Sequence, residues 1–125
     1  MRTFSYKGWI CFIKHFDRIT TGGHYCGYVS LKKGYSKYMN QDYADSKLSV
    51  HGGVTFSSHA LFSTDDTSVL IKGNIIGFDC AHAEDDPQFG GTVKDEKFVE
   101  NELKSMVDQL RKRWLWAFFQ RLLGR

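Results

Sequence analysis

Two histidines and two aspartates are the residues of this chain best suited to bind a metal ion. His51 precedes two glycines, and Asp79, His82 and Asp85 lie close together further along the sequence. Imidazole nitrogens and carboxylate oxygens bind divalent ions, and a mixture of the two suits Zn²⁺ best. In an extended segment Asp79 and His82 would point to opposite faces, so a shared ion requires the chain to turn after Asp79. We therefore predict a zinc site formed by His51, Asp79, His82 and Asp85.

Three further residues, His24, Cys26 and Cys80, are second candidates for metal ligands. The three cysteines of the chain have no C-x-x-C spacing, and the pattern matches no standard zinc finger. A closed shell of four ligands would make the ion structural, which is the interpretation we favour. An open position would instead let a metal-bound water attack an ester or phosphodiester, with Glu84 or Asp86 as general base. Each residue alone also has an ordinary role, as a hydrogen-bonded histidine, a buried thiol or a loop cap.

Length and composition predict a single domain over residues 1–125. Of the 125 residues, 42% are hydrophobic and 15% aromatic, which is enough apolar surface for one core. The longest apolar runs are about five residues, far short of the roughly 20 that a membrane-spanning helix needs. An odd number of cysteines argues against a disulfide framework. We therefore expect an intracellular protein with reduced thiols and no membrane span.

The net charge of +3 conceals an uneven distribution of charge. Residues 65–108 contain eleven acidic and four basic residues, whereas residues 109–125 contain five basic and no acidic ones. Charge pairing within the domain would explain this pattern, and so would a partner-binding face. Because a net charge of +3 is too small to indicate nucleic-acid recognition, we expect no direct binding to nucleic acid.

The apolar pattern predicts an α+β fold, in which a small mixed or antiparallel sheet of four to six strands is packed by a long C-terminal helix. Val99, Leu103, Met106 and Leu110 recur every three or four residues, which predicts a helix over residues 94–123. Residues 1–93 are expected to supply mainly strands and the metal-site loops. The expected strands are 3–16, 25–31, 48–56 and either two short strands or one kinked strand over 69–78, with a long loop and one helical turn at 32–47.

The end of the predicted helix is basic and rich in aromatic residues. Trp114, Trp116, Phe118 and Phe119 lie in a run of apolar residues too dense for one face of a helix to bury. A groove-docking helix, a self-association surface and a membrane-surface helix would each use this pattern. We favour a protein partner or a dimer, because Trp, Phe and Arg are enriched at protein interfaces.

Three segments resemble the motifs of a family of small phage- and prophage-encoded proteins. These motifs look like H-x-C-G-Y-V, V-H-G-G-[LV]-T and G-F-D-C-A-H, and the likeness covers roughly residues 22–110. Glu84 stands where that family usually has glycine, and the basic aromatic extension after Leu110 departs from the family. The segments are His24-Tyr25-Cys26-Gly27-Tyr28-Val29, Val50-His51-Gly52-Gly53-Val54-Thr55 and Gly77-Phe78-Asp79-Cys80-Ala81-His82.

The resemblance implies a role in the interaction between a phage and its host cell. Small phage proteins with such extensions include anti-CRISPR proteins, and this chain is similar to the metal-containing inhibitors of Cas9-type nucleases. The resemblance implies a non-enzymatic zinc protein of the host cell cytoplasm. An acidic segment such as residues 79–108 would occupy the nucleic-acid channel of Cas9, and the aromatic tail would anchor it. Two alternatives are a metal-dependent hydrolase of a nucleotide or phosphodiester and a protein that sequesters a nucleotide second messenger.

Overall fold

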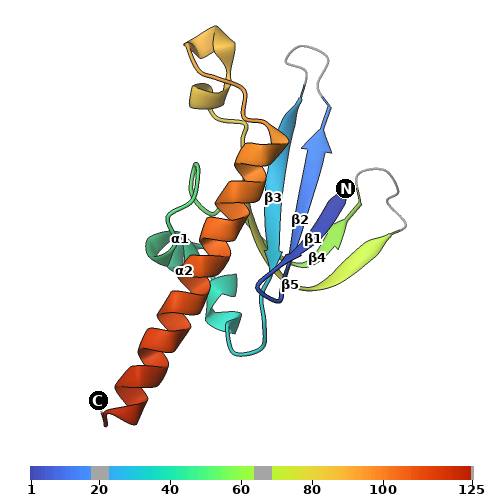
Figure 1. Cartoon of the computed structure of the whole chain (residues 1–125). Coiled ribbons are helices and arrows are strands. Elements are labelled where there is room, and N and C mark those ends of the chain that lie inside the picture. Colours follow the sequence, from blue (N-terminus) through green and yellow to red (C-terminus); the bar gives the residue numbers. More distant parts are fainter. Residues whose placement is uncertain (18–22, 64–68, 125) are drawn as a thin grey trace.

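The chain folds into a five-stranded antiparallel sheet with a long C-terminal helix packed against it (Figure 1). The computed structural model describes residues 1–17, 23–63 and 69–124. The predicted α+β fold is confirmed. In chain order the elements are β1 (Arg2–Tyr6), β2 (Trp9–Phe16), β3 (His24–Ser30), η1 (Ser36–Met39), α1 (Gln41–Lys47), β4 (Phe56–Phe62), β5 (Leu70–Asp79), η2 (Ala83–Asp85), η3 (Pro87–Phe89) and α2 (Glu96–Leu122).

The strand order β1-β2-β3-β5-β4 places β5 inside the sheet, between β3 and β4. Every neighbouring pair is antiparallel. Cys26 of β3 pairs with Asp79 at the end of β5 on one side and with Lys14 of β2 on the other. The sheet therefore holds the predicted ligand Asp79 at the end of an inner strand, where the chain leaves for the loops that precede α2.

The segment predicted as one strand, residues 3–16, is instead a hairpin formed by β1 and β2. At its turn Lys7 and Gly8 have φ angles of 50° and 80°. Positive φ at both central positions is the geometry that joins two antiparallel strands through two residues. Asn-Gly and Asp-Gly are the usual sequences for this turn, so Lys-Gly gave little signal of a hairpin.

Helix α2 covers one face of the sheet and carries the predicted apolar stripe. Asp95 caps its first turn by accepting a hydrogen bond from the backbone N–H of Phe98, at 2.8 Å. Val99, Leu103, Met106 and Leu110 are all fully buried, so the spacing of three and four residues marks the packed face as expected. No helix among the described residues is long and apolar enough to cross a membrane.

Two predictions for the segment between β3 and β4 need correction, one of a strand and one of a loop. Residues 48–56 were predicted to form a strand, but they run through a turn and an irregular segment, and only Phe56 belongs to β4. Leu48, Val50 and Val54 resemble an alternating strand because the loop still inserts apolar side chains into the core. Residues 32–47 are more helical than predicted, since they contain both η1 and α1. The predicted alternatives for 69–78 resolve into one continuous strand, β5.

Candidate functional site

His51 lies in the turn between α1 and β4 and is positioned by two partners. Its backbone N–H donates to Glu102 Oε1 of α2 at 2.9 Å, which fixes the turn against the helix. Its Nε2 lies 2.9 Å from each carboxylate oxygen of Asp85. A carboxylate can only accept a hydrogen bond here, so Nε2 carries the proton. The edge of the ring packs against Phe98, with the ring centroids 5.1 Å apart.

Asp85 is the most buried carboxylate of the site, with only 2% of its side chain exposed. Burial alone would raise its pKa, but hydrogen bonds from His51, from the backbone N–H of His82 and from Lys94 outweigh burial and lower the pKa. Lys94 Nζ lies 3.3 Å from Asp85 Oδ1. The carboxylate is therefore ionised and fully engaged by donors that come from three different segments of the chain.

Asp79 and His82 form a second pair where β5 ends. The chain turns after Asp79, as predicted, and His82 Nε2 lies 3.2 Å from Asp79 Oδ1 and 3.1 Å from its carbonyl oxygen. Both of these atoms are acceptors, so His82 also carries its proton on Nε2. Thr55 Oγ1 donates to the other carboxylate oxygen at 2.9 Å, and the N–H of Ala81 donates to Oδ1 at 3.0 Å. Asp79 is therefore held in place by the Thr55 hydroxyl and by the backbone of the turn that follows β5.

The two glycines after His51 allow close contacts on two sides, Gly52 with His82 and Gly53 with Asp45. Gly52 has a φ of +70°, and a Cβ added there would lie 2.1 Å from His82 Nε2. Gly53 has a φ of +83°, and a Cβ would lie 2.6 Å from Asp45 Oδ1, which accepts the N–H of Val54. A side chain at either position would meet both backbone strain and a steric clash. The His-Gly-Gly sequence is therefore required by the close packing of this site.

All four predicted ligands lie near one another, yet they do not converge on a single point. The ring centroids of His51 and His82 are 5.8 Å apart. Each histidine directs its Nε2 at its own carboxylate, so the two rings do not face a common point. No group of three or more His, Cys, Asp or Glu side chains within residues 1–17, 23–63 and 69–124 has the geometry to hold a metal ion. The arrangement consists of two histidine–carboxylate pairs, and a zinc shell built from them stays a prediction.

The second-choice ligands are divided between different parts of the fold. Cys26 belongs to a separate apolar cluster with Phe12, Tyr28, Leu61 and Ile75, whereas Cys80 belongs to the main core. Burial raises the pKa of the Cys80 thiol to about 12. His24 and Cys80 do share a cavity of about 240 Å³ with three residues in or next to η2: His82, Asp85 and Asp86.

The two candidate general bases differ in where they point. Glu84 is 63% exposed, with Oε1 at 3.7 Å from His51 Nε2. Asp86 caps η3 instead, by accepting the N–H of Gln88 at 2.9 Å. Glu84 alone of the two approaches the histidines.

Sequence reasoning missed the residues that hold the site together. Lys94 contacts Asp85, Glu102 of α2 contacts His51, and Thr55, directly before β4, donates to Asp79 at the end of β5. Only Thr55 gave a signal, because it lies in the same glycine-containing segment as His51. Contacts between residues so far apart in sequence leave no local pattern.

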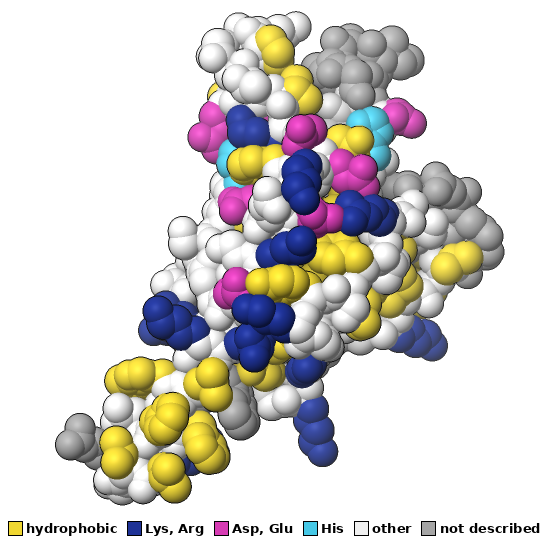
Figure 2. Space-filling model, in the orientation of Figure 1, with side chains coloured by type: hydrophobic (Ala, Val, Ile, Leu, Met, Phe, Trp, Pro, Cys, Tyr) yellow, Lys and Arg dark blue, Asp and Glu magenta, His cyan; other side chains and the backbone are white. Residues whose placement is uncertain are grey.

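Several carboxylates of the acidic segment 79–108 are paired with basic side chains within the domain. Glu100 is buried and contacts Arg2, Lys97 and Lys104, and these contacts lower its pKa to about 2. Lys7 Nζ lies 2.7 Å from Asp108 Oδ1. Acidic and basic side chains alternate over this part of the surface (Figure 2). Internal charge pairing therefore accounts for much of the uneven charge distribution.

The last turns of α2 extend beyond the sheet and expose a cluster of large apolar side chains (Figures 1 and 2). We call this cluster the apolar end of α2. Trp114 lies on the same turns, but its side chain is outside the described part of the structure. Between 46% and 69% of each residue is exposed in the apolar end, which consists of Leu115, Trp116, Phe118, Phe119, Leu122 and Leu123.

No protein-family model, curated protein or solved structure matches the chain.

Proposed function

We propose that the protein acts by binding, and that the apolar end of α2 inserts into an apolar groove on a host protein. The single observation that supports this proposal is the exposure of Leu115, Phe118, Phe119 and Leu122. These residues lie at positions i, i+3, i+4 and i+7, the anchor spacing of a helix that docks into a groove. Large apolar clusters left open to solvent are uncommon on proteins that have no partner.

A protein groove fits this helix end better than a second copy of the chain does. Residues 109–125 carry five positive charges and no negative ones, so two copies packed through this end would bring ten positive charges together. The exposed segment 115–123 is only about 13 Å long, which suits a few anchors in a groove. A partner with acidic residues around an apolar groove would satisfy both the leucines and the arginines.

The partner that we propose is a Cas9-type nuclease, and this choice rests on the resemblance to phage-encoded proteins. Because acidic residues of segment 79–108 are engaged by Arg2, Lys7, Lys94, Lys97 and Lys104, we place the main contact at the apolar end of α2. Binding there would inhibit the nuclease without any turnover.

The experiment combines size-exclusion chromatography with a DNA-cleavage assay on a Cas9–guide complex. We expect the wild-type chain to co-elute with the complex and to slow cleavage, and the triple variant Leu115→Ser/Phe119→Ser/Leu122→Ser to lose both effects. The matched control replaces three exposed apolar residues elsewhere: Phe62→Ser, Phe89→Ser and Val93→Ser.

Three outcomes would contradict the proposal. The first is failure of the wild-type chain to bind the complex, and the second is equal loss of binding in the control. The third is that the wild-type chain forms dimers, or binds anionic vesicles, through the same three residues and does so in preference to the nuclease.

A further inference from the structure

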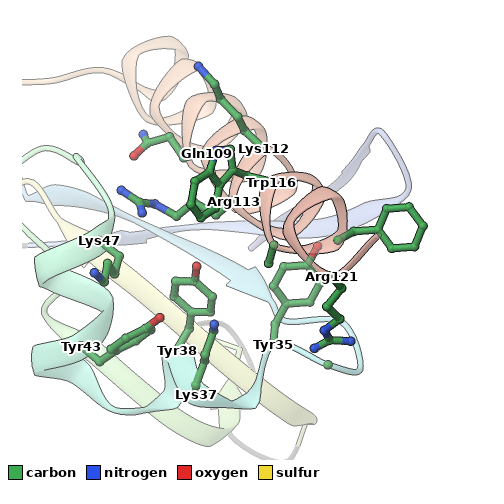
Figure 3. A pocket seen from close by; sticks show the side chains of 13 residues that line it. Tyr35, Lys37, Tyr38, Tyr43, Lys47, Gln109, Lys112, Arg113, Trp116 and Arg121 are labelled. Carbon is green, nitrogen blue, oxygen red and sulfur yellow. The ribbon is translucent and has the colours of Figure 1, made fainter. Parts of the chain in front are cut away.

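A groove of about 640 Å³ lies between α2 and the segment formed by η1 and α1 (Figure 3). We call it the basic groove. One wall comes from Tyr35, Lys37, Tyr38, Tyr43 and Lys47, and the other comes from Gln109, Lys112, Arg113, Trp116, Phe118 and Arg121. Its volume falls within the range of about 300 to 1,000 Å³ that is typical of sites for small ligands.

The charge of the basic groove is positive and uncompensated. Five of its lining side chains are Lys or Arg, and none is Asp or Glu. Within the described residues, none of these five cations forms an ion pair, whereas Arg2, Lys7, Lys94, Lys97 and Lys104 at the other end of α2 all do. Asp45 of the neighbouring helix α1 is engaged by the N–H of Val54. An anion entering the groove would therefore find positive charges that no described carboxylate neutralises.

The wall of the basic groove that η1 and α1 form is aromatic and closely packed. Tyr38 and Tyr43 meet edge to face with ring centroids 5.3 Å apart, and only 2% of Tyr38 is exposed. Lys37 and Lys47 lie over the ring of Tyr43, at 5.6 Å and 5.7 Å from its centroid. Burial raises the pKa of Tyr38, so its hydroxyl stays neutral and does not repel an anion.

The opposite wall offers a second aromatic surface that is open to solvent. Trp116 is 65% exposed and lines the groove opposite the tyrosines. Aromatic residues thus line both walls, so a planar ring in the groove would meet an aromatic side chain on either wall, and phosphates attached to it would lie among the cations around the groove. Positive charge combined with aromatic stacking surfaces is the chemistry by which proteins bind single-stranded nucleic acid and nucleotides.

We infer that the basic groove binds nucleoside phosphates, with a base stacked against Tyr43 and Trp116 and the phosphates held by Arg113, Arg121 and Lys37. An acidic peptide would use the charge but leave the aromatic walls unused. A bare phosphate would fill little of the volume. The ligand is either a free nucleotide or a short stretch of single-stranded nucleic acid.

The basic groove shares Trp116 and Phe118 with the apolar end of α2, but the two surfaces can be tested separately. Leu115, Phe119 and Leu122 do not line the basic groove. Their triple substitution tests protein docking and leaves the proposed nucleotide contacts in place, so the two proposals can fail separately.

The test measures fluorescence anisotropy of a fluorescein-labelled ten-residue oligothymidylate and calorimetric binding of ATP and of the dinucleotide pTpT, between 50 and 200 mM NaCl. We expect the double variant Arg113→Gln/Arg121→Gln to weaken binding about tenfold or more and to lower the salt slope by about two. The matched control Lys33→Gln/Lys72→Gln removes the same charge from exposed positions outside the groove and should bind as the wild type does.

A second variant separates stacking from charge. Tyr43→Leu/Trp116→Leu should weaken binding of every nucleotide probe that binds the wild type while leaving the salt slope unchanged. Tight binding of the oligonucleotide alone would identify a single strand as the ligand, and stoichiometric binding of ATP or pTpT would identify a free nucleotide. Failure to bind any probe at 50 mM NaCl would overturn the inference. So would equal weakening in the lysine control, or polyglutamate binding as tightly as the oligonucleotide.

Discussion

Replacing Gly52 with alanine should lower the free energy of unfolding, mainly because the new methyl group would displace the ring of His82. The φ of +70° at Gly52 costs an alanine about 1 kcal/mol in backbone strain. The new Cβ would also lie 2.1 Å from His82 Nε2, so the ring must leave the two acceptors of Asp79 that it now contacts at 3.1 and 3.2 Å. Losing those hydrogen bonds adds about 1 to 3 kcal/mol. The total is a decrease of about 2 to 4 kcal/mol in the free energy of unfolding.

Gly90 provides a matched control for the backbone contribution. It has a φ of +78°, and a methyl group placed there would have no atom within 4 Å, so Gly90→Ala should cost only the strain, about 1 kcal/mol. For 125 residues, an unfolding entropy of about 0.26 kcal/mol/K makes each kcal/mol worth roughly 4 °C. Thermal melts should therefore fall by about 4 °C for Gly90→Ala and by about 8 to 15 °C for Gly52→Ala.

A double-mutant cycle tests the cause directly. In a His82→Ala background the clash no longer exists, so Gly52→Ala should cost about as much as Gly90→Ala does. If Gly52→Ala and Gly90→Ala were equally destabilising in the wild-type background, or if removing His82 left the cost of Gly52→Ala unchanged, His82 would not lie against Gly52 and the reasoning would be refuted.

Three further predictions concern charge, thiols and metal. The pKa of Glu100 is lowered to about 2, so its contribution to stability is complete above about pH 4.5 and is lost as the pH falls toward 2. In acid titrations followed by circular dichroism, the stability of Glu100→Gln should therefore fall less steeply with pH than that of the wild type. Burial raises the pKa of Cys11 to about 12, so its thiol should resist Ellman's reagent at pH 8 until the protein is unfolded, and rapid labelling of the native protein would contradict its burial. If His51 and His82 bind zinc, elemental analysis should find one zinc per chain, lost in His51→Ala and in His82→Ala; a metal-free protein with an unchanged melt in chelator would remove the zinc hypothesis.

The sequence was most informative where a local pattern and the fold agree. The stripe from Val99 to Leu110 predicts both the helix and its buried face, because packing on the sheet needs the same spacing that a helix supplies. The alternation of Leu48, Val50 and Val54 predicted a strand wrongly, because two glycines with positive φ turn the backbone between them. Local periodicity cannot distinguish a strand from a loop that inserts alternate apolar side chains.

The sequence predicts which residues lie near one another in the site, but it does not predict which of them form hydrogen bonds with each other. The turn after Asp79 brings His82 back to it, as expected from the loss of apolar pattern there. The pairing of His51 with Asp85 depends on the docking of its turn on Glu102 of α2, and no pattern near His51 reveals that contact. Likewise, a net charge of +3 gives no sign that folding gathers five cations around one groove.

The close contact between β3 and α2 is a point about which a tilt of the helix would move its far end. Gly27 has no side chain, and a Cβ there would lie 2.9 Å from Val99 Cγ1, so the helix rests directly on the strand at this point. From Val99 to Leu122 the helix runs about 35 Å, and a tilt of about 5° at this pivot would displace its far end by about 3 Å. A methyl group at Gly27 would therefore shift the apolar end and one wall of the basic groove together, without altering a single residue in either.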